Sequence, residues 1–153
     1  MSHRRNSILA SFFVPALLVF AAGSARATAS FDCTIEDKNV TIELQGNLGS
    51  GDGAALQIPN GSIKIKPVRG KLDTVEFDVA KGTLAQQWTF DKELRIGLMT
   101  DEVKDVSAYL VIIAQQGKPK DDLTQWKGRY VLKIQGPKGA TELKGTLKSC
   151  QAG

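Results

Sequence analysis

The sequence predicts an all-β fold, in which an antiparallel meander forms a sandwich or a small barrel of about eight to nine strands. Three observations lead to this prediction. Apolar and polar residues alternate along most of the chain after residue 28, turn signals separate the alternating runs, and two cysteines lie near the two ends of this region. A period of two places apolar side chains on one face of each strand, as expected for a sheet with one covered face.

The first part of this region contains several runs with an apolar face that a sheet could bury. Turn signals rich in Gly, Pro, Asn, Asp and Lys separate them, including Pro59-Asn60-Gly61, Pro67-Val68-Arg69-Gly70, Lys81-Gly82 and Asp91-Lys92. The apolar positions of the runs are Phe31, Cys33 and Ile35; Val40, Ile42 and Leu44; Ile63 and Ile65; Val75, Phe77 and Val79; and Leu94, Ile96 and Leu98.

The last hairpin can be paired residue by residue around a turn at Pro137-Lys138. In this register Leu132 lies opposite Leu143, and Tyr130 covers Gly145, as an aromatic ring can cover a glycine on the next strand. One face is then apolar and the other polar, which supports the register. Cys150 would fall on the polar face, so the strand must bend after Lys148.

Residues 101–116 allow two interpretations. Thr100 could cap a helix that begins with Asp101-Glu102 and ends before Gly117. The aromatic and β-branched run from Tyr109 to Ile113 instead favours a strand from about Ser107 to Gln115. The strand is preferred, and a single short helix near 101–116 is the alternative.

Residues 1–27 have the pattern of a cleaved secretory signal peptide. Arg4 and Arg5 precede an apolar run, and Ala25-Arg26-Ala27 supplies a small-x-small cleavage site. The run is short for a bilayer span of about 20 residues. We therefore expect residues 28–153 to form a single periplasmic or secreted β domain without a transmembrane span.

The charge of the chain lies largely in its leader. Twenty Lys and Arg oppose sixteen Asp and Glu, but three arginines and no acid fall within residues 1–27. The remainder carries seventeen basic and sixteen acidic residues, a balance of +1. A nucleic-acid-binding domain is normally strongly basic, so no nucleic-acid partner is expected.

Cys33 and Cys150 are the two cysteines of the chain. In an oxidising compartment, two cysteines in a small exported domain usually pair. A bridge between them would join the two ends of the β domain.

The sequence lacks the residues that several kinds of catalytic site require. The one histidine is His3, so the mature chain can form no Ser-His-Asp or Cys-His site and no imidazole metal site. Carboxylate pairs such as Glu76 and Asp78 suit a solvated strand face better than catalysis. No enzyme activity, metal or cofactor is expected.

A basic face on the last hairpin is the candidate site. Lys127, Arg129, Lys144 and Lys148 share the polar side of the predicted register and could meet an anionic cell-surface polymer or an envelope protein. The alternative is a solubilising outer face. The basic face could extend to Lys64, Lys66, Arg69 and Lys71. The two tryptophans of the chain, Trp88 and Trp126, are expected to lie in the core.

The leading hypothesis is a non-catalytic exported domain that binds a macromolecular partner or assists an envelope complex. If the basic face does not bind a partner, the loops Gly46–Gly53 and Gly117–Asp122 are the next candidates for the binding site. The alternative function is a small apolar-ligand carrier, a barrel with a cavity lined by Tyr109, Val111, Ile113, Trp126, Tyr130 and Leu132.

Overall fold

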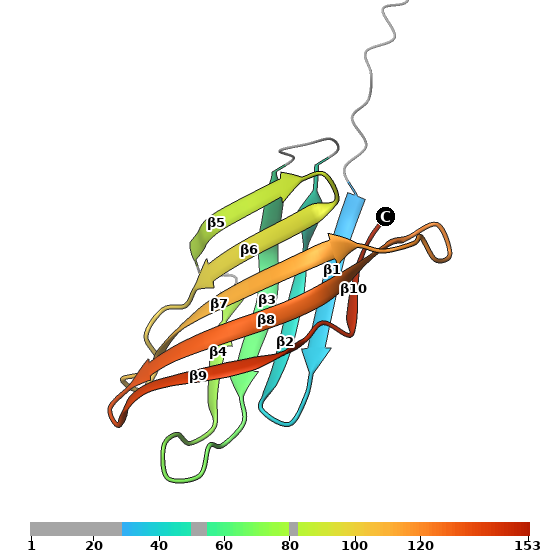
Figure 1. Ribbon diagram of the computed structural model, residues 1–153. Helices are drawn as coiled ribbons and strands as arrows, with labels where there is room; N and C mark the ends of the chain where they lie inside the picture. Colours follow the sequence, from blue (N-terminus) through green and yellow to red (C-terminus); the bar gives the residue numbers. More distant parts are fainter. Residues whose placement is uncertain (1–28, 50–54, 80–82) are drawn as a thin grey trace, which may run out of the picture.

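Figure 1 shows the computed structural model, which describes residues 29–49, 55–79 and 83–153. The predicted signal peptide, residues 1–27, and the turn at Lys81-Gly82 lie outside the described residues. The all-β prediction is confirmed, and every strand pairing is antiparallel. The strands are β1 (Ala29–Glu36), β2 (Val40–Leu48), β3 (Leu56–Ile65), β4 (Val75–Asp78), β5 (Thr83–Phe90), β6 (Glu93–Met99), β7 (Ser107–Gln116), β8 (Thr124–Gly136), β9 (Gly139–Thr146) and β10 (Ser149–Ala152).

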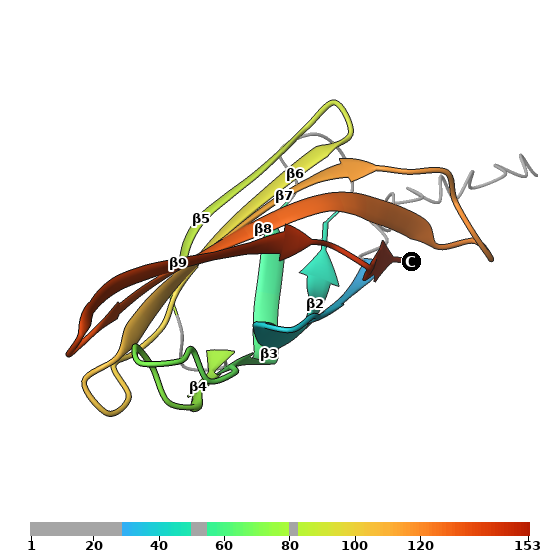
Figure 2. The same cartoon turned by 60° about the horizontal axis from the view of Figure 1, so that its bottom comes forward.

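The strands form one sheet that curls into a half-barrel. Its order is β4-β3-β2-β1-β10-β8-β7-β6-β5, with β9 also paired to β8. Figure 2 shows the two arms that result, β1–β4 on one side and β5–β9 on the other. The short strand β10 lies between β1 and β8, so it joins the two arms.

The core lies between the two arms. On most strands, the buried side chains alternate with exposed or half-buried ones, as the sequence pattern predicts. Both arms contribute residues that are at most 1 % exposed: Ile35, Ile42, Ile63 and Phe77 from the β1–β4 arm, and Ile96, Leu110, Ile112 and Leu132 from the β5–β9 arm.

Residues 107–116 form the strand β7, so the helix alternative for 101–116 is wrong. Thr100 does not cap a helix. Its Oγ1 accepts a hydrogen bond from the Ala108 amide at 2.9 Å, next to the strand. Within the described residues, nothing forms a helix of the length and hydropathy that a membrane span requires.

Tight turns connect several strands, and one predicted turn is wrong. Asp91 and Lys92 both have positive φ, as a two-residue hairpin turn of type I′ requires. Pro59-Asn60-Gly61, predicted as a turn, lies within β3 instead. The register between β2 and β3 shifts here, because a β-bulge absorbs the irregular backbone.

The register predicted for the last hairpin is confirmed. Leu132 pairs with Leu143 and Tyr130 with Gly145. A Cβ at Gly145 would clash with the Tyr130 ring, so only glycine fits beneath it. The predicted bend is also present, since β9 ends at Thr146 and β10 begins at Ser149.

Tyr130 ties the two arms together through a polar contact. It is fully buried on β8, and its hydroxyl donates a hydrogen bond to Asp37 Oδ2 at 2.5 Å. Asp37 lies in the turn between β1 and β2, where its Oδ1 also accepts from the amides of Asn39 and Val40 at 2.7 and 3.0 Å.

This contact shifts the pKa of both groups. Burial alone would raise the pKa of Asp37, but the hydrogen bonds from Tyr130, Asn39 and Val40 and the charge of Lys66 hold it below its ordinary value. Burial and the neighbouring Asp37 carboxylate raise the pKa of Tyr130. The pair is therefore most stable with Asp37 ionised and Tyr130 protonated.

The predicted disulfide is present between Cys33 on β1 and Cys150 on β10. The two residues are direct partners in the ladder, and both are buried. The bond spans 117 residues of sequence, so it covalently fixes the last strand beside the first.

Replacing Cys33 and Cys150 together with Ala should lower the free energy of unfolding by roughly 3–5 kcal/mol, because a loop on the order of 100 residues is no longer closed in the unfolded chain. Urea denaturation at pH 7 measures this. Reduced wild-type protein should match the variant. A variant as stable as the oxidised wild type would show that the bond contributes little.

The Tyr130→Phe variant should have a free energy of unfolding about 1.5–3 kcal/mol lower at pH 7, since a hydrogen bond to a charged group is lost. Because the pKa of Asp37 is lowered in the folded protein, the Tyr130–Asp37 hydrogen bond contributes to the free energy of unfolding above about pH 4. This contribution is lost as the pH falls further. Because the pKa of Tyr130 is raised in the folded protein, the same contribution is present below about pH 10 and is lost as the pH rises above that value.

The stability gap between wild type and Tyr130→Phe should therefore narrow at both extremes, as measured by urea midpoints from pH 2.5 to 11. Tyr109→Phe, which changes a tyrosine on the outer face, is the control and should keep the wild-type profile. A gap that is constant with pH would contradict the role of the Asp37 contact.

Candidate functional site

Three of the four predicted basic residues lie together on the outer face of the β5–β9 arm. Lys127 and Arg129 point outward from β8, and Lys144 points outward from β9, where it pairs with Val131. Lys148 is exposed in the bend between β9 and β10, outside the strand ladder. The structure thus brings three of the residues onto one surface and leaves Lys148 at its border.

The same face carries an aromatic pair that the sequence analysis placed in the core. Trp126 is buried as predicted, but Trp88 is 44 % exposed, so that part of the prediction is wrong. Trp88 stacks on Phe90, with ring centroids 5.8 Å apart, and the Arg95 guanidinium lies 5.1 Å from the centre of the Trp88 ring. This distance suits a cation–π contact.

One row of cross-strand partners joins the aromatic and basic parts. Trp88 pairs with Arg95, Arg95 with Ile113, and Ile113 with Arg129 across β5 to β8. We call the outward residues of β5–β9 around this row the basic–aromatic face. It consists of Trp88, Phe90, Glu93, Arg95, Met99, Tyr109, Val111, Ile113, Gln115, Lys127, Arg129, Val131, Lys133, Glu142 and Lys144.

Arg95 and Lys133 are site residues that the sequence analysis missed. A hairpin centred on the turn Asp91-Lys92 places Trp88 opposite Arg95, so this signal was present in the sequence. Lys133 follows from the alternation along β8, on the same side as Arg129. These two positions extend the basic residues towards both the aromatic pair and the far end of the sheet.

The basic–aromatic face has an excess of positive charge. Its two carboxylates are each engaged. Glu93 accepts hydrogen bonds from Arg95 and Gln115, and Glu142 lies 2.7 Å from Lys144. The hydrogen bond from Lys144 and its charge lower the pKa of Glu142. Five cations against these two acids give a balance of +3: Arg95, Lys127, Arg129, Lys133 and Lys144.

The outer face of the β1–β4 arm has the opposite character. Lys64 lies 3.6 Å from Glu76, and Lys66 lies 3.6 Å from Glu36. Five acids and these two lysines give a balance of −3, the acids being Asp32, Glu36, Glu43, Glu76 and Asp78.

The predicted extension of the basic face is therefore wrong. Lys64 and Lys66 belong to the acidic face, and Arg69 and Lys71 lie in the connection between β3 and β4. Since the two arms face each other across the core, their outer faces point away from each other (Figure 2).

The apolar lining proposed for a carrier cavity divides between the two faces of the sheet. Trp126, Tyr130 and Leu132 are buried and point towards the core. The other three, Tyr109, Val111 and Ile113, are half-buried on the opposite parity of β7 and belong to the basic–aromatic face. These six residues do not line one cavity.

A hollow marks the end of the basic–aromatic face. It has a volume of about 500 Å³ and borders Met99, Tyr109, Lys133 and Glu142 from four adjacent strands. Met99 is 53 % exposed there. A single exposed apolar side chain is common on protein surfaces, so this hollow adds no separate functional argument.

The carboxylate pair of the sequence analysis, Glu76 and Asp78, borders a hollow together with Asp101. Glu76 and Asp78 point outward from β4, and Asp101-Glu102 and Asp121-Asp122 are exposed in connections. Among residues 29–49, 55–79 and 83–153, no three His, Cys, Asp or Glu side chains are grouped as metal ligands.

No protein-family model, curated protein or solved structure matches the chain. The charge and the aromatic residues of the outer face therefore carry the functional argument.

The two tryptophans should respond differently to an anionic quencher of fluorescence. Iodide should quench Trp88, which is exposed beside Arg95, and leave the buried Trp126 largely unquenched. Trp88→Phe should remove the quenchable emission, whereas Trp126→Phe should retain it. Equal quenching of both variants would contradict the exposure of Trp88.

Proposed function

We propose that this chain is an exported, non-catalytic β domain that binds an anionic cell-surface polymer through the basic–aromatic face. The observation that carries the proposal is the separation of charge between the two arms. An acidic and a basic face on one small domain orient it towards an anionic partner and favour encounter through the basic side.

The layout of the basic–aromatic face supports a polymer as the partner. Neighbouring strands of a sheet lie about 4.8 Å apart. Cations on β6, β8 and β9 therefore form a spaced array rather than a single pocket. An open surface of spaced charges suits a chain of repeated anionic units, and the exposed Trp88 and Phe90 add planar apolar area against which such units can pack.

The expected export of the chain supports a partner at the cell surface. The disulfide is compatible with an oxidising compartment, and residues 1–27 have the composition of a signal peptide.

The test is binding of polygalacturonate, a carboxylate polymer, by the purified protein. Affinity should fall steeply between 20 and 150 mM salt, because exposed charges are screened beyond about 8 Å at physiological ionic strength. The Lys127→Glu/Arg129→Glu variant should bind at least tenfold more weakly at low salt.

The matched control is Arg69→Glu/Lys71→Glu, which makes the same change in net charge in the β3–β4 connection. It should bind nearly as the wild type does. Equal weakening of both variants would mean that only net charge matters, and an unaffected Lys127→Glu/Arg129→Glu variant would return the face to a solubilising role. Tighter binding of polyglutamate than of polygalacturonate would favour an acidic protein instead.

A further inference from the structure

The β5–β9 arm ends in a strand with one free edge. Among the described strands β9 pairs with β8 alone, and Figure 1 shows it at the margin of the arm. The Leu147 amide donates a hydrogen bond to the Gly128 carbonyl, which continues the β8–β9 ladder and fixes its alternation. The odd-numbered residues of β9 therefore bond to β8, and the backbone N–H and C=O groups of residues 140, 142, 144 and 146 point away from the sheet.

The two other edges of the sheet are less suited to accept a further strand. β4 has only four residues. The register of β5 shifts between Leu84 and Gln86, and the Gln87 side chain accepts a hydrogen bond from the Leu56 amide at the start of β3. β9 has eight residues in an unbroken register, and its outward backbone groups have no partner within the described part of the chain. Such a row is a template for another strand.

The charges on the outer side of β9 complement themselves. Glu142 and Lys144 lie on either side of Leu143. When two copies of β9 run antiparallel with Leu143 on a twofold axis, Glu142 of each copy lies opposite Lys144 of the other. Both residues turn their backbone groups towards the new partner, so this register forms hydrogen bonds and an ion pair on each side of the axis.

Other registers lack this match. Sliding one strand by two residues keeps the hydrogen bonds but places Glu142 opposite Glu142, or Lys144 opposite Lys144. Like charges directly opposite each other destabilise a sheet. Lysine on an edge strand normally hinders the addition of a strand, and here only one register offsets that effect.

We propose that two copies of this chain associate through β9, antiparallel about Leu143, so that their β5–β9 arms form one continuous sheet. In the single chain Lys144 lies 2.7 Å from Glu142 of its own strand, and the dimer replaces this contact by one to the other copy. A twofold interface uses the same surface on both copies, so association stops at the dimer.

The dimer would join two basic–aromatic faces. Opposite residues of an antiparallel pair project to the same side of a sheet, so the outer faces of both arms would lie on one side. Self-association does not depend on the proposed function. If the polymer also binds, one polymer chain can contact both copies, which raises its affinity because the second contact is intramolecular.

Sedimentation velocity of the purified protein, without any polymer, tests the association. The wild type should pass from monomer to dimer as its concentration rises from about 5 to 500 µM. Lys144→Glu and Glu142→Lys each place like charges on both sides of the axis, so each should dimerise about tenfold more weakly. An equal mixture of the two variants restores both ion pairs and should form a heterodimer.

Two further variants separate register from net charge. Glu142→Lys/Lys144→Glu exchanges the two charges without changing their sum, and it should dimerise as the wild type does. Lys118→Glu makes the same change in net charge as Lys144→Glu but lies in the β7–β8 connection. It should leave dimerisation unchanged.

Amide hydrogen exchange locates the interface. The amides of residues 140, 142, 144 and 146 face water in the single chain, so they should exchange rapidly at low concentration and slowly at high concentration. The amides of Thr141 and Leu143 bond to β8 and should be protected at both concentrations.

Three results would overturn the proposal. The first is a wild type that stays monomeric up to 500 µM, which would leave the edge to a strand of a different protein. The second is a dimer that neither Lys144→Glu nor Glu142→Lys weakens, and the third is a dimer in which β5 instead of β9 gains protection. Since no polymer is present, these results are independent of whether the protein binds polygalacturonate.

Discussion

The placement of β10 between β1 and β8 is the constraint on which the rest of the structure depends. Each arm is a meander of neighbouring strands, which local turns can form, and among the described strands β10 alone pairs with a strand of each arm. The bend at Leu147-Lys148 makes the placement possible, because it turns Cys150 from the outer parity of β9 to the buried side. The bond to Cys33 then fixes β10 beside β1. Tyr130 and Asp37 add a second link between the arms, from β8 to the first turn.

The sequence predicted those features that arise from local pairing. The register of β8 and β9 followed from the turn and from the two faces it creates, and the disulfide followed from the cysteine count and the expected oxidising compartment. The sequence could not predict that β10 pairs with the same edge of β8 as β9 does, since no local turn connects β8 to β10. The turn predicted at Pro59-Asn60-Gly61 failed for a related reason, because pairing with β2 overrides a local preference when a bulge can accommodate it.

The candidate site was predicted only in part, because alternation along one strand does not show which other strands share its outer face. Tryptophan is usually buried, but Trp88 lies on the same parity as Phe90, opposite Arg95, where the outer side of the sheet is solvated. Likewise, Lys64 alternates with apolar residues just as Lys127 does, but their strands belong to different arms. The net charge of residues 28–153, which is +1, gave no sign of the two faces, because +3 on one outer face and −3 on the other cancel. Only the curl of the sheet assigns each charge to its side.

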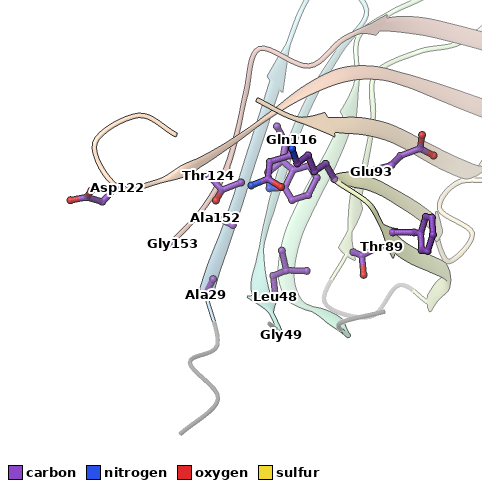
Figure 3. A pocket seen from close by; sticks show the side chains of 13 residues that line it. Ala29, Leu48, Gly49, Thr89, Glu93, Gln116, Asp122, Thr124, Ala152 and Gly153 are labelled. Atoms are coloured by element: carbon purple, nitrogen blue, oxygen red, sulfur yellow. The ribbon is translucent and has the colours of Figure 1, made fainter. Parts of the chain in front are cut away.

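Phe90 extends the basic–aromatic face to the end of the half-barrel. It ends β5, stacks on Trp88, and lines a hollow that Trp126 also borders (Figure 3). Lys92, in the turn that follows, borders the same hollow with a positive charge. Under the proposed function, an anionic polymer bound along the row from Trp88 to Arg129 can continue over Phe90 towards Lys92. Each further contact would raise the affinity, because it becomes intramolecular once the first is made.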